Sequence, residues 1–505
     1  MLHDMILKRF ASISMMLALP ALMPGNSAMA VVKPANLFTS HAVLQRNTTL
    51  PVWGTAAEGK TITVKIADQQ VSTKVANGQW MVKLKPLKAG GPYTMTISGD
   101  STITLTDILI GDVWLCSGQS NMDKEVGPHR NQPNVDNYLE ELANANHPQI
   151  RLFKVPAKEG ALSPQEAVNT HWTLCDSANV RSFSAAGYFF GRDLQPDIKV
   201  PVGLIHSCWG GTPAECWLDK NVMATNPELQ SLVTEYEAAM KAYPTQAAKL
   251  QQAIQSAADK GQRDTVSMKA LTQLNLIKRN CGGLYNAMIY PLRNFPLTGV
   301  IWYQGESNSD RAKQYQTLFP ALIKNWRDTW KSNLPFLFVQ IAPYKTKGPE
   351  IREAQFLTWK KVPNTFMAVI TDGVDSSFNL HPGNKQLVGA RLALAARAMV
   401  YKEKIEYSGP VYQSVSFKEN QAILSFTHTG SGLMAKNGPL TGFTIAGKDG
   451  VFVPARADIK GNQVVVSADG VKSPAAVRFG WNDIPHDNFY NKEGLPASPF
   501  RTDVE

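Results

Sequence analysis

Three hydrophobic patterns follow one another along the chain. Residues 31–110 contain short stretches, among them 61–66 and 79–84, in which apolar and polar positions alternate between turns rich in Gly, Asn and Pro. Alternation with a period of two puts every second side chain on one face of a strand. The same alternation returns in residues 401–505. Both segments are therefore predicted to be β-domains of the antiparallel, sandwich type.

The middle segment, residues 111–400, has a different rhythm. Apolar runs of strand length, such as 366–370, alternate with helical stretches such as 318–330. Strands that alternate with helices predict a parallel sheet, so the fold class is α/β. Within this segment, residues 221–279 are rich in Ala, Gln, Lys and Glu and contain no strand-like run, which predicts a helical insertion.

The first thirty residues are typical of a signal peptide. Lys8 and Arg9 precede an apolar stretch at 13–23, and a small-x-small pattern ends at Ala30. That stretch is too short for a permanent transmembrane helix, and no later segment is apolar for long enough. We expect an exported protein, periplasmic or secreted, that begins near Val31 and has no stable membrane anchor.

Composition narrows the class of protein further. Of the 505 residues, 44% are hydrophobic and 18% are charged, which indicates a globular chain of two to four domains. The formal net charge is +10, but Lys and Arg form no arm or stripe along the sequence. We therefore expect no nucleic-acid partner, and the basic balance could favour an acidic sugar or a negatively charged cell surface. Nothing in the pattern specifies an oligomeric state.

The five cysteines give no sign of a metal site. None of them shows zinc-ligand spacing with histidines, and we expect neither a metal nor an organic cofactor. Export permits disulfides, although the odd number leaves at least one thiol without an intramolecular partner. Cys116 and Cys208 lie in predicted strands, where burial as small apolar residues is the simpler interpretation.

The most informative residues follow the strand at 111–118. This apolar run gives way to small and polar residues, which leaves the Ser120 hydroxyl on the turn after the strand. Ligands of open α/β sheets collect at the carboxyl ends of the strands. Ser120 is therefore the candidate nucleophile.

A serine nucleophile needs a base, and His381 is the best candidate among the nine histidines. It follows the apolar run 366–371 and a loop that contains Asp372 and Asp375, and a helical stretch comes after it. This order places His381 in a strand-to-helix connection, as it does Ser120. Either aspartate could orient the imidazole, although turn or helix-cap roles are the alternative for both.

Two more strand ends offer donors for an oxyanion. The run 200–209 ends at Gly210 and Gly211, and paired glycines allow backbone N–H groups to approach a substrate closely. The run 298–303 is followed by Gln304 and Asn308, whose amide side chains can also donate.

Aromatic and basic residues near these ends are candidate substrate contacts. Trp209, Trp302 and Tyr303 could stack on sugar rings, with core packing as the alternative for those within or next to strands. Arg311 and Arg352 could bind a sugar carboxylate, with a solvated surface position as the alternative.

With these residues, the sequence resembles the SGNH-type carbohydrate acetylesterases usually called sialate O-acetylesterases. The resemblance is colinear and covers nearly the whole chain, through segments 36–54, 111–122, 200–217, 283–308, 381–389 and 488–503. It implies an SGNH-hydrolase-like three-layer α/β/α domain at 111–400, flanked by β-sandwich-type domains. It also implies Ser120 as nucleophile, His381 as base, and oxyanion donors from the Ser120 backbone, the glycine pair and the 304–308 loop.

One position departs from the family pattern. SGNH hydrolases often carry an aspartate three residues before the histidine, where this chain has Phe378, and Asn379 stands two before. The third member of the triad is thus left open between Asp375, Asp372 and a main-chain carbonyl that would leave a Ser–His dyad.

The function that the resemblance implies is removal of acetyl groups from sugar hydroxyls through an acetyl-serine intermediate. O-acetylated sialic acid and acetylated hemicellulose-type glycans are both possible substrates. Two alternatives come from other classes: a non-catalytic carbohydrate-binding protein, and a short-chain lipid esterase or thioesterase. The lipid enzyme would need a long apolar acyl pocket, which polar and glycine-rich strand ends do not suggest.

Overall fold

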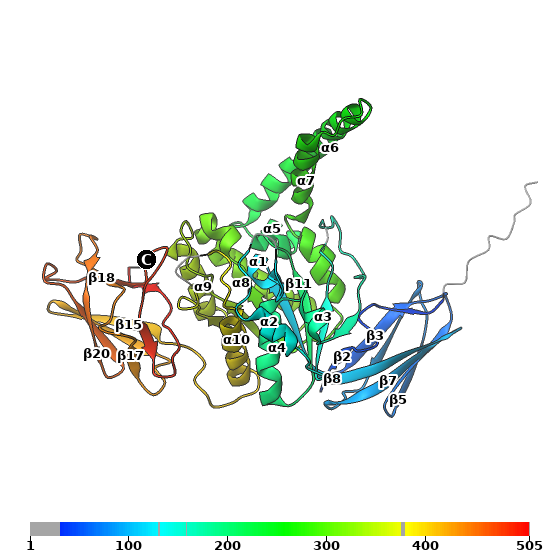
Figure 1. The fold of residues 1–505 in the computed structure, drawn as a ribbon, viewed down its shortest axis with the longest axis horizontal. Coiled ribbons are helices and arrows are strands. Elements are labelled where there is room, and N and C mark those ends of the chain that lie inside the picture. Colours follow the sequence, from blue (N-terminus) through cyan, green and yellow to red (C-terminus); the bar gives the residue numbers. More distant parts are fainter. Residues whose placement is uncertain (1–30, 130–131, 158, 375–378, 504–505) are drawn as a thin grey trace, which may run out of the picture.

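A computed structural model describes residues 31–129, 132–157, 159–374 and 379–503. Figure 1 shows an elongated molecule in which a β-rich part at the N-terminal end, a central part of helices and strands, and a second β-rich part follow one another. The predicted signal peptide at 1–30 and the candidate Asp375 lie outside the described residues. Within them, no helix is long and apolar enough to cross a membrane.

The N-terminal part consists of strands whose buried side chains alternate. β1 (Lys33–Pro34), β3 (Leu50–Thr55) and β6 (Gln79–Leu84) form one antiparallel sheet. A second group pairs β5 (Gln69–Lys74) with β4 (Thr61–Ile66), β4 with β7 (Gly90–Ser98), and β7 with β8 (Thr102–Gly118). In β6 the exposed and buried positions alternate strictly, so the apolar residues form one face.

The long strand β8 connects this part to the central sheet. Its first half pairs antiparallel with β7, and its second half pairs in parallel with β11 (Val202–Cys208) and β12 (Gly299–Tyr303). β2 (Val43–Gln45) also pairs with it, near the crossover. Gly111 lies at this point, where a Cβ atom would come within 2.0 Å of the Pro201 carbonyl oxygen. Only glycine allows the two backbones to approach so closely.

The central sheet has the strand order β10-β9-β11-β8-β12-β13-β14 and is parallel except for β10 at one edge. The strands not yet bounded are β9 (Ile150–Lys154), β10 (Trp172–Leu174), β13 (Phe336–Val339) and β14 (Thr365–Ala368). The mixed α/β class predicted from the sequence is confirmed.

Helices cover both faces of this sheet. Side chains of α4 (Ala185–Ile198) and α10 (Lys385–Met399) share one buried cluster with Tyr303. Side chains of α8 (Ala312–Trp330) and α9 (Pro349–Lys361) share another with Trp302. Because successive strand residues point to opposite faces, Trp302 and Tyr303 belong to different cores. The central part is therefore a sheet between two helical layers.

Shorter helices complete the central part. They are α1 (Ser120–Asp123), α2 (Tyr138–Ala143), α3 (Ser177–Val180) and α5 (Lys220–Ala224), with short 3-10 or π-helical segments at Ala214–Trp217, Leu276–Arg279, Tyr285–Ile289, Tyr290–Leu292 and Glu306–Arg311.

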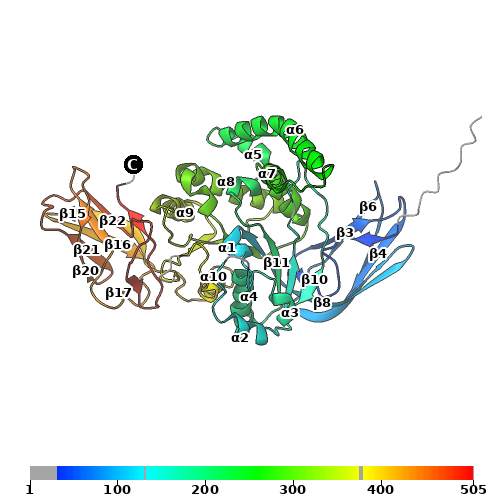
Figure 2. The same ribbon diagram turned by 45° about the horizontal axis from the view of Figure 1, so that its top comes forward.

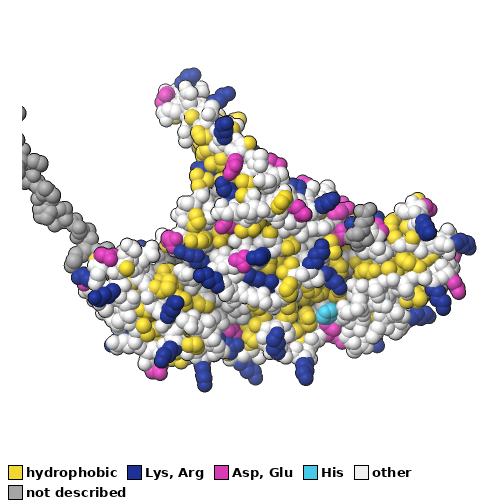
Figure 3. All heavy atoms as spheres, turned by 180° about the vertical axis from the view of Figure 1, so that it is seen from behind, with side chains coloured by type: hydrophobic (Ala, Val, Ile, Leu, Met, Phe, Trp, Pro, Cys, Tyr) yellow, Lys and Arg dark blue, Asp and Glu magenta, His cyan; other side chains and the backbone are white. Residues whose placement is uncertain are grey.

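A helical arm rises from the central part. It consists of α6 (Gln230–Ala258) and α7 (Thr265–Asn275), which pack against each other and project from the body (Figure 1; Figure 2). Only Leu232, Val233 and Ala247 of α6 are buried, and no residue of α7 is. Seen from behind, the outer end of the arm carries charged side chains (Figure 3). The arm follows β11 and α5 in the chain, so it rises from the edge of the sheet where the strands end.

The C-terminal part is β-rich and has its own core. Its three sheets have the orders β15-β16-β21-β20, β17-β23 and β19-β18-β22-β24. The strands are β15 (Val411–Lys418), β16 (Gln421–Thr427), β17 (Leu433–Ala435), β18 (Phe443–Ala446), β19 (Val453–Pro454), β20 (Arg456–Lys460), β21 (Gln463–Ser467), β22 (Ala476–Phe479), β23 (Phe489–Asn491) and β24 (Phe500–Arg501). Side chains from all three sheets share one buried cluster.

Candidate active site

Ser120 lies on a tight turn at the carboxyl end of β8. Gly118 precedes it with φ +141°, and a Cβ atom there would come within 2.2 Å of the Tyr303 carbonyl oxygen. The Gln119 N–H donates to the same oxygen at 3.0 Å, which fixes the turn against β12. Helix α1 begins at Ser120, whose side chain is half-buried. Only glycine at position 118 therefore allows the chain to turn so close to β12 just before Ser120.

His381 lies in the loop between β14 and α10, and it contacts the serine directly. Its Nε2 atom is 2.8 Å from Ser120 Oγ, although the two residues are 261 positions apart. The His381 N–H donates to Asn379 Oδ1 at 2.9 Å. The distance between Nε2 and Oγ suits transfer of the hydroxyl proton to the imidazole.

The surroundings of His381 favour its neutral form. Burial lowers the pKa of the imidazole to about 4, and the positive charges of Lys385 and Lys124 act in the same direction. A neutral imidazole at neutral pH can accept the serine proton, whereas an imidazolium cannot.

A buried hydrogen-bond network joins the serine turn to the histidine loop. Asn121 Nδ2 donates to Glu306 Oε1 at 2.6 Å and to the Leu380 carbonyl at 2.9 Å. Lys385 Nζ donates to Asn121 Oδ1 at 2.8 Å and to the Pro382 carbonyl at 2.9 Å. Asn121, the residue after Ser120, therefore holds the carbonyl of the residue before His381. Lys385, which also donates to Asn121, holds the carbonyl of the residue after His381.

Both charged members of this network are buried. Burial raises the pKa of Glu306 and lowers the pKa of Lys385 to about 7. Each group's charge partly offsets the effect of burial on the other. The Glu306 carboxyl is 3% exposed, so the loss of its neighbours would leave an unpaired acid in the interior.

The glycine turn lies against the serine. A Cβ atom on Gly210 would be 3.4 Å from Ser120 Cβ, while the same position on Gly211, which has φ +69°, faces open space. Asp123 Oδ1 is 3.3 Å from His206 Nε2. Although burial raises the pKa of Asp123, hydrogen bonds from His206 and the Gly210 backbone lower it overall. Asp123 therefore links helix α1 to the glycine turn.

The amide side chains of Gln304 and Asn308 form hydrogen bonds with other buried side chains. Gln304 Nε2 donates to Asn308 Oδ1 at 2.7 Å, and Asn308 Nδ2 donates to Glu215 Oε2 at 2.9 Å. Tyr315 donates to Gln304 Oε1 at 3.0 Å. Both residues are buried, and their network supports the chain after the glycine turn through Ala214 and Thr212. These contacts do not support the oxyanion role expected for them.

The two strand aromatics expected to meet the substrate are core residues. Trp302 packs against Trp326 and Phe336, and neither Trp302 nor Tyr303 has any exposed surface. Because successive residues of β12 point to opposite faces of the sheet, Trp302 packs against one helical layer and Tyr303 against the other. Trp209 differs, because it is half-buried and its ring lies 3.7 Å from the Arg279 guanidinium carbon.

The two arginines also differ from each other. Arg352 has no exposed surface, and its guanidinium donates to the carbonyls of Lys347, Asn482 and Asp483, so the surface position considered for it is wrong. Arg311 is 38% exposed and donates to Glu215 Oε1 at 2.5 Å. Only Arg311 is thus available to a ligand.

Asp372 makes a bidentate ion pair away from His381. Its two carboxylate oxygens accept from Arg391 Nη1 at 2.6 Å and Nη2 at 2.8 Å. This pair ties the end of β14 to α10. Asp372 therefore has a structural partner, and the position of Asp375 lies outside the described residues.

Sequence reasoning missed three residues of the site: Asn121, Glu306 and Lys385. Each is within four positions of a residue that had been singled out, but nothing in the sequence shows that a carboxylate, an amide and an ammonium group meet in the interior. Among the described residues, no group of three or more His, Cys, Asp or Glu could hold a metal ion, and the five cysteines are free and buried.

A serine hydroxyl in contact with a neutral imidazole at the carboxyl edge of a parallel sheet is what a serine esterase requires. Residues 110–264 and 266–398 match the family model described as carbohydrate esterase, sialic acid-specific acetylesterase. The chain therefore belongs to this family and is an ester hydrolase acting on carbohydrate.

Individual relatives agree with the family model over most of the chain. Sialate O-acetylesterase of Rattus norvegicus is 30% identical over 92% of this chain and 93% of its own, and that of Homo sapiens is 32% identical over 75% and 72%. The crystal structure of a carbohydrate acetylesterase from Xanthomonas citri superposes with a TM-score of 0.80 at 36% identity, covering 94% of this chain and all of that one.

Proposed function

We propose that the enzyme removes acetyl groups from sugar hydroxyls through an acetyl-enzyme formed on Ser120. The observation that carries this proposal is the 2.8 Å contact between Ser120 Oγ and His381 Nε2. As Oγ attacks the acetyl carbonyl, its proton passes to Nε2, which then gives it to the departing sugar oxygen. Water activated by the same imidazole releases acetate and restores the serine.

For the oxyanion, we propose the backbone N–H groups of Ser120 and of the Gly210–Gly211 turn. The turn lies beside the serine, and the space next to Gly211 is open. The buried network of Gln304 and Asn308 then supports this turn from behind, which is a positioning role rather than a direct one.

For the third triad member, we propose Asp375. Asp372 is paired with Arg391, whereas Asp375 stands six residues before His381 in the sequence. Asp375→Asn should lower kcat by about two orders of magnitude or more, because the imidazole would lose the group that orients it. Retention of activity in this variant would instead favour a main-chain carbonyl and a Ser–His dyad.

The substrate we propose is an O-acetylated sialic acid or an acetylated hemicellulose-type glycan. The two mammalian relatives above are named for the first, and Arg311, which is 38% exposed and pairs with Glu215, suits a sugar carboxylate. We also propose that the central part is an SGNH-hydrolase-like three-layer domain and that the flanking parts are β-sandwich-type domains. The parallel strand order and the two helical layers support the first of these.

The location we propose is the periplasm or the medium, from the signal-peptide pattern of residues 1–30. Amino-terminal sequencing of the active protein from its source should give a start near Val31. Recovery of mature active protein that still begins at Met1 would contradict export.

Acetate release tests the proposed activity. Ser120→Ala and His381→Ala should each lower it by about three orders of magnitude without loss of folding. A panel of O-acetylated sialic acids, acetylated xylan and xyloglucan fragments, and p-nitrophenyl esters of rising chain length identifies the substrate. Faster hydrolysis of the octanoyl than of the acetyl ester would favour a lipid esterase instead.

A further inference from the structure

Three hollows with several basic lining residues, of about 680, 590 and 490 Å³, lie next to one another. The first two lie at the edge of the central sheet opposite Ser120, and the third is lined mainly by residues of the N-terminal β-rich part. The first and second share Lys331 and Ser332, and the second and third share Arg293 and Asn294. Because neighbouring hollows share lining residues, they adjoin one another, and we call the three together the basal groove.

The basal groove is remote from the catalytic serine. Its lining includes Leu297, Leu334 and Pro363, which come just before β12, β13 and β14. Ser120, by contrast, follows the carboxyl end of β8. Since these strands are parallel, the first two hollows and the serine lie at opposite edges of the sheet, separated by roughly 15 Å of strand.

Among the charged side chains of the lining, cations outnumber acids. The cations of the three hollows are Lys33, Arg46, Lys74, Arg293, Lys324, Arg327, Lys331 and Lys361, against two acids, Glu166 and Asp328. With Asp112, the ion-pair partner of Arg46, counted as a third acid, these eight cations and three acids carry a formal charge of +5. In the view from behind, Lys and Arg side chains are spread across the middle of the molecule (Figure 3).

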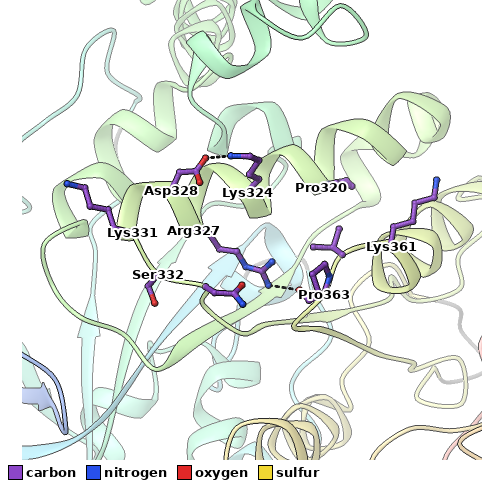
Figure 4. A pocket seen from close by; sticks show the side chains of 10 residues that line it. Pro320, Lys324, Arg327, Asp328, Lys331, Ser332, Lys361 and Pro363 are labelled. Carbon is purple, nitrogen blue, oxygen red and sulfur yellow. Dashed lines mark hydrogen bonds and ion pairs between the residues drawn. The ribbon is translucent and has the colours of Figure 1, made fainter.

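Part of this charge has no protein counter-ion. Lys331 and Lys361 are exposed and form no ion pair within the part of the chain that the structure describes. Arg327 donates only to backbone carbonyls, those of Leu334, Pro363 and Asn364. Figure 4 shows Lys331 and Lys361 at opposite ends of the largest hollow, with Arg327 between them. The ion pairs of the lining join Lys324 to Asp328, Arg293 to Glu166, and Arg46 to Asp112.

The remaining lining suits sugars. Amide side chains of Asn36, Asn47, Asn294 and Asn333 line the groove, and amides exchange hydrogen bonds readily with sugar hydroxyls. The half-buried ring of Trp53 adds an aromatic surface in the third hollow.

We propose that the basal groove is a second carbohydrate-binding site, which holds an acidic oligosaccharide chain away from the catalytic serine. Its cations neutralise carboxylates along the chain, and its amides and Trp53 contact the neutral parts of the sugars. The proposal goes beyond the esterase function and does not depend on it, because binding is measured without turnover.

The test is calorimetric binding of an unacetylated α2,8-linked oligosialic acid to the full-length protein. The groove variant carries Lys331→Glu and Lys361→Glu. The control variant carries Lys418→Glu and Lys460→Glu, which make the same charge change at exposed positions of the C-terminal part. We expect the groove variant to bind about tenfold more weakly. Each exposed lysine contributes a few-fold to the affinity, and the glutamate that replaces it repels the carboxylates of the ligand. The control should change less than twofold.

Hydrolysis of p-nitrophenyl acetate should be the same in the wild type and both variants, which shows that folding and the catalytic site are intact. Absence of binding by the wild type, or equal loss in the groove and control variants, would overturn the site. Tighter binding to phosphatidylserine vesicles, lost in the groove variant alone, would assign the groove to a membrane surface and overturn the carbohydrate proposal.

Discussion

Ser120 and His381 meet because the residues around them are held by three buried side chains. Asn121, Glu306 and Lys385 come from three different segments, and together they fix the serine turn and both carbonyls beside His381. None of the three contacts the position of a reacting atom, so we regard them as positioning residues. Their role yields predictions at the scale of single residues.

Glu306→Gln should lower kcat by about tenfold to a hundredfold and leave KM nearly unchanged. The reason is that a small displacement of the nucleophile relative to its base is costly, whereas substrate contacts are untouched. Steady-state kinetics on p-nitrophenyl acetate measure this effect, and Glu350→Gln, at an exposed position, is the matched control. An equal loss in both variants, or a change confined to KM, would contradict positioning.

The pH dependence follows from the depressed pKa of His381. Because the folded-state pKa of about 4 lies below the usual 6.5, the imidazole stays neutral until the pH falls towards 4. The acid limb of kcat/KM should therefore lie near pH 4, and Lys385→Met should move it upward by removing a nearby positive charge. A wild-type limb at pH 6.5 or above would show that burial and these charges do not lower the pKa of the base, and no shift in the variant would show that Lys385 does not contribute.

The sequence singled out Ser120 and His381, which the structure places in contact, but it did not show which neighbouring residues face them. Ser120 and His381 follow from their places between strands and helices. Trp302 and Tyr303 also stand near a strand end, yet helices on both faces of the sheet bury them. Burial of this kind depends on the packing of segments far away in the chain, which no local pattern reveals. Arg352 is buried for the same reason.

At the scale of elements, the strand boundaries explain where the chemistry lies. The sequence correctly predicted the mixed α/β class, because the period of its apolar residues changes between the parts. It did not show that β8 is shared between the first β-rich part and the central sheet. Continuity of one strand through two sheets depends on pairing with distant strands, as does the need for glycine at position 118.

Gly118→Ala should destabilise the protein by about 3 kcal/mol or more, because the new methyl group would overlap the Tyr303 backbone and the residue has positive φ. Gly59→Ala is the control, since that glycine also has positive φ but has open space around its Cβ position. It should cost only about 1 kcal/mol. Denaturant unfolding measures both free energies, and equal costs would refute the close approach.

At the scale of the whole molecule, charged side chains connect the C-terminal part to the central part. Arg352 donates to carbonyls of the loop at 482–483, and Arg501 Nε donates to Glu353 Oε1 at 2.7 Å. Glu353 is 5% exposed, so its charge depends on this partner. The two parts are therefore expected to unfold together rather than independently.

Arg501→Ala should lower the free energy of unfolding by about 2 kcal/mol, because it leaves a buried carboxylate without its partner. Arg456→Ala removes an exposed pair with Asp458 in the same C-terminal part and should change stability by less than about 0.5 kcal/mol. Urea unfolding followed by tryptophan fluorescence compares the two variants. A cost for Arg501→Ala no larger than that of the control would mean that the ion pair does not fasten the parts together.

The central claim is that acetyl transfer passes through Ser120, and rapid-quench mass spectrometry tests it most directly. Wild-type enzyme mixed with an acetylated substrate, quenched in acid and digested, should yield the Ser120 peptide carrying one acetyl group. The label should disappear as turnover ends, and it should be absent from Ser120→Ala. Continued release of acetate by Ser120→Ala at more than a tenth of the wild-type rate, or an acetyl group on a different residue, would contradict the assignment.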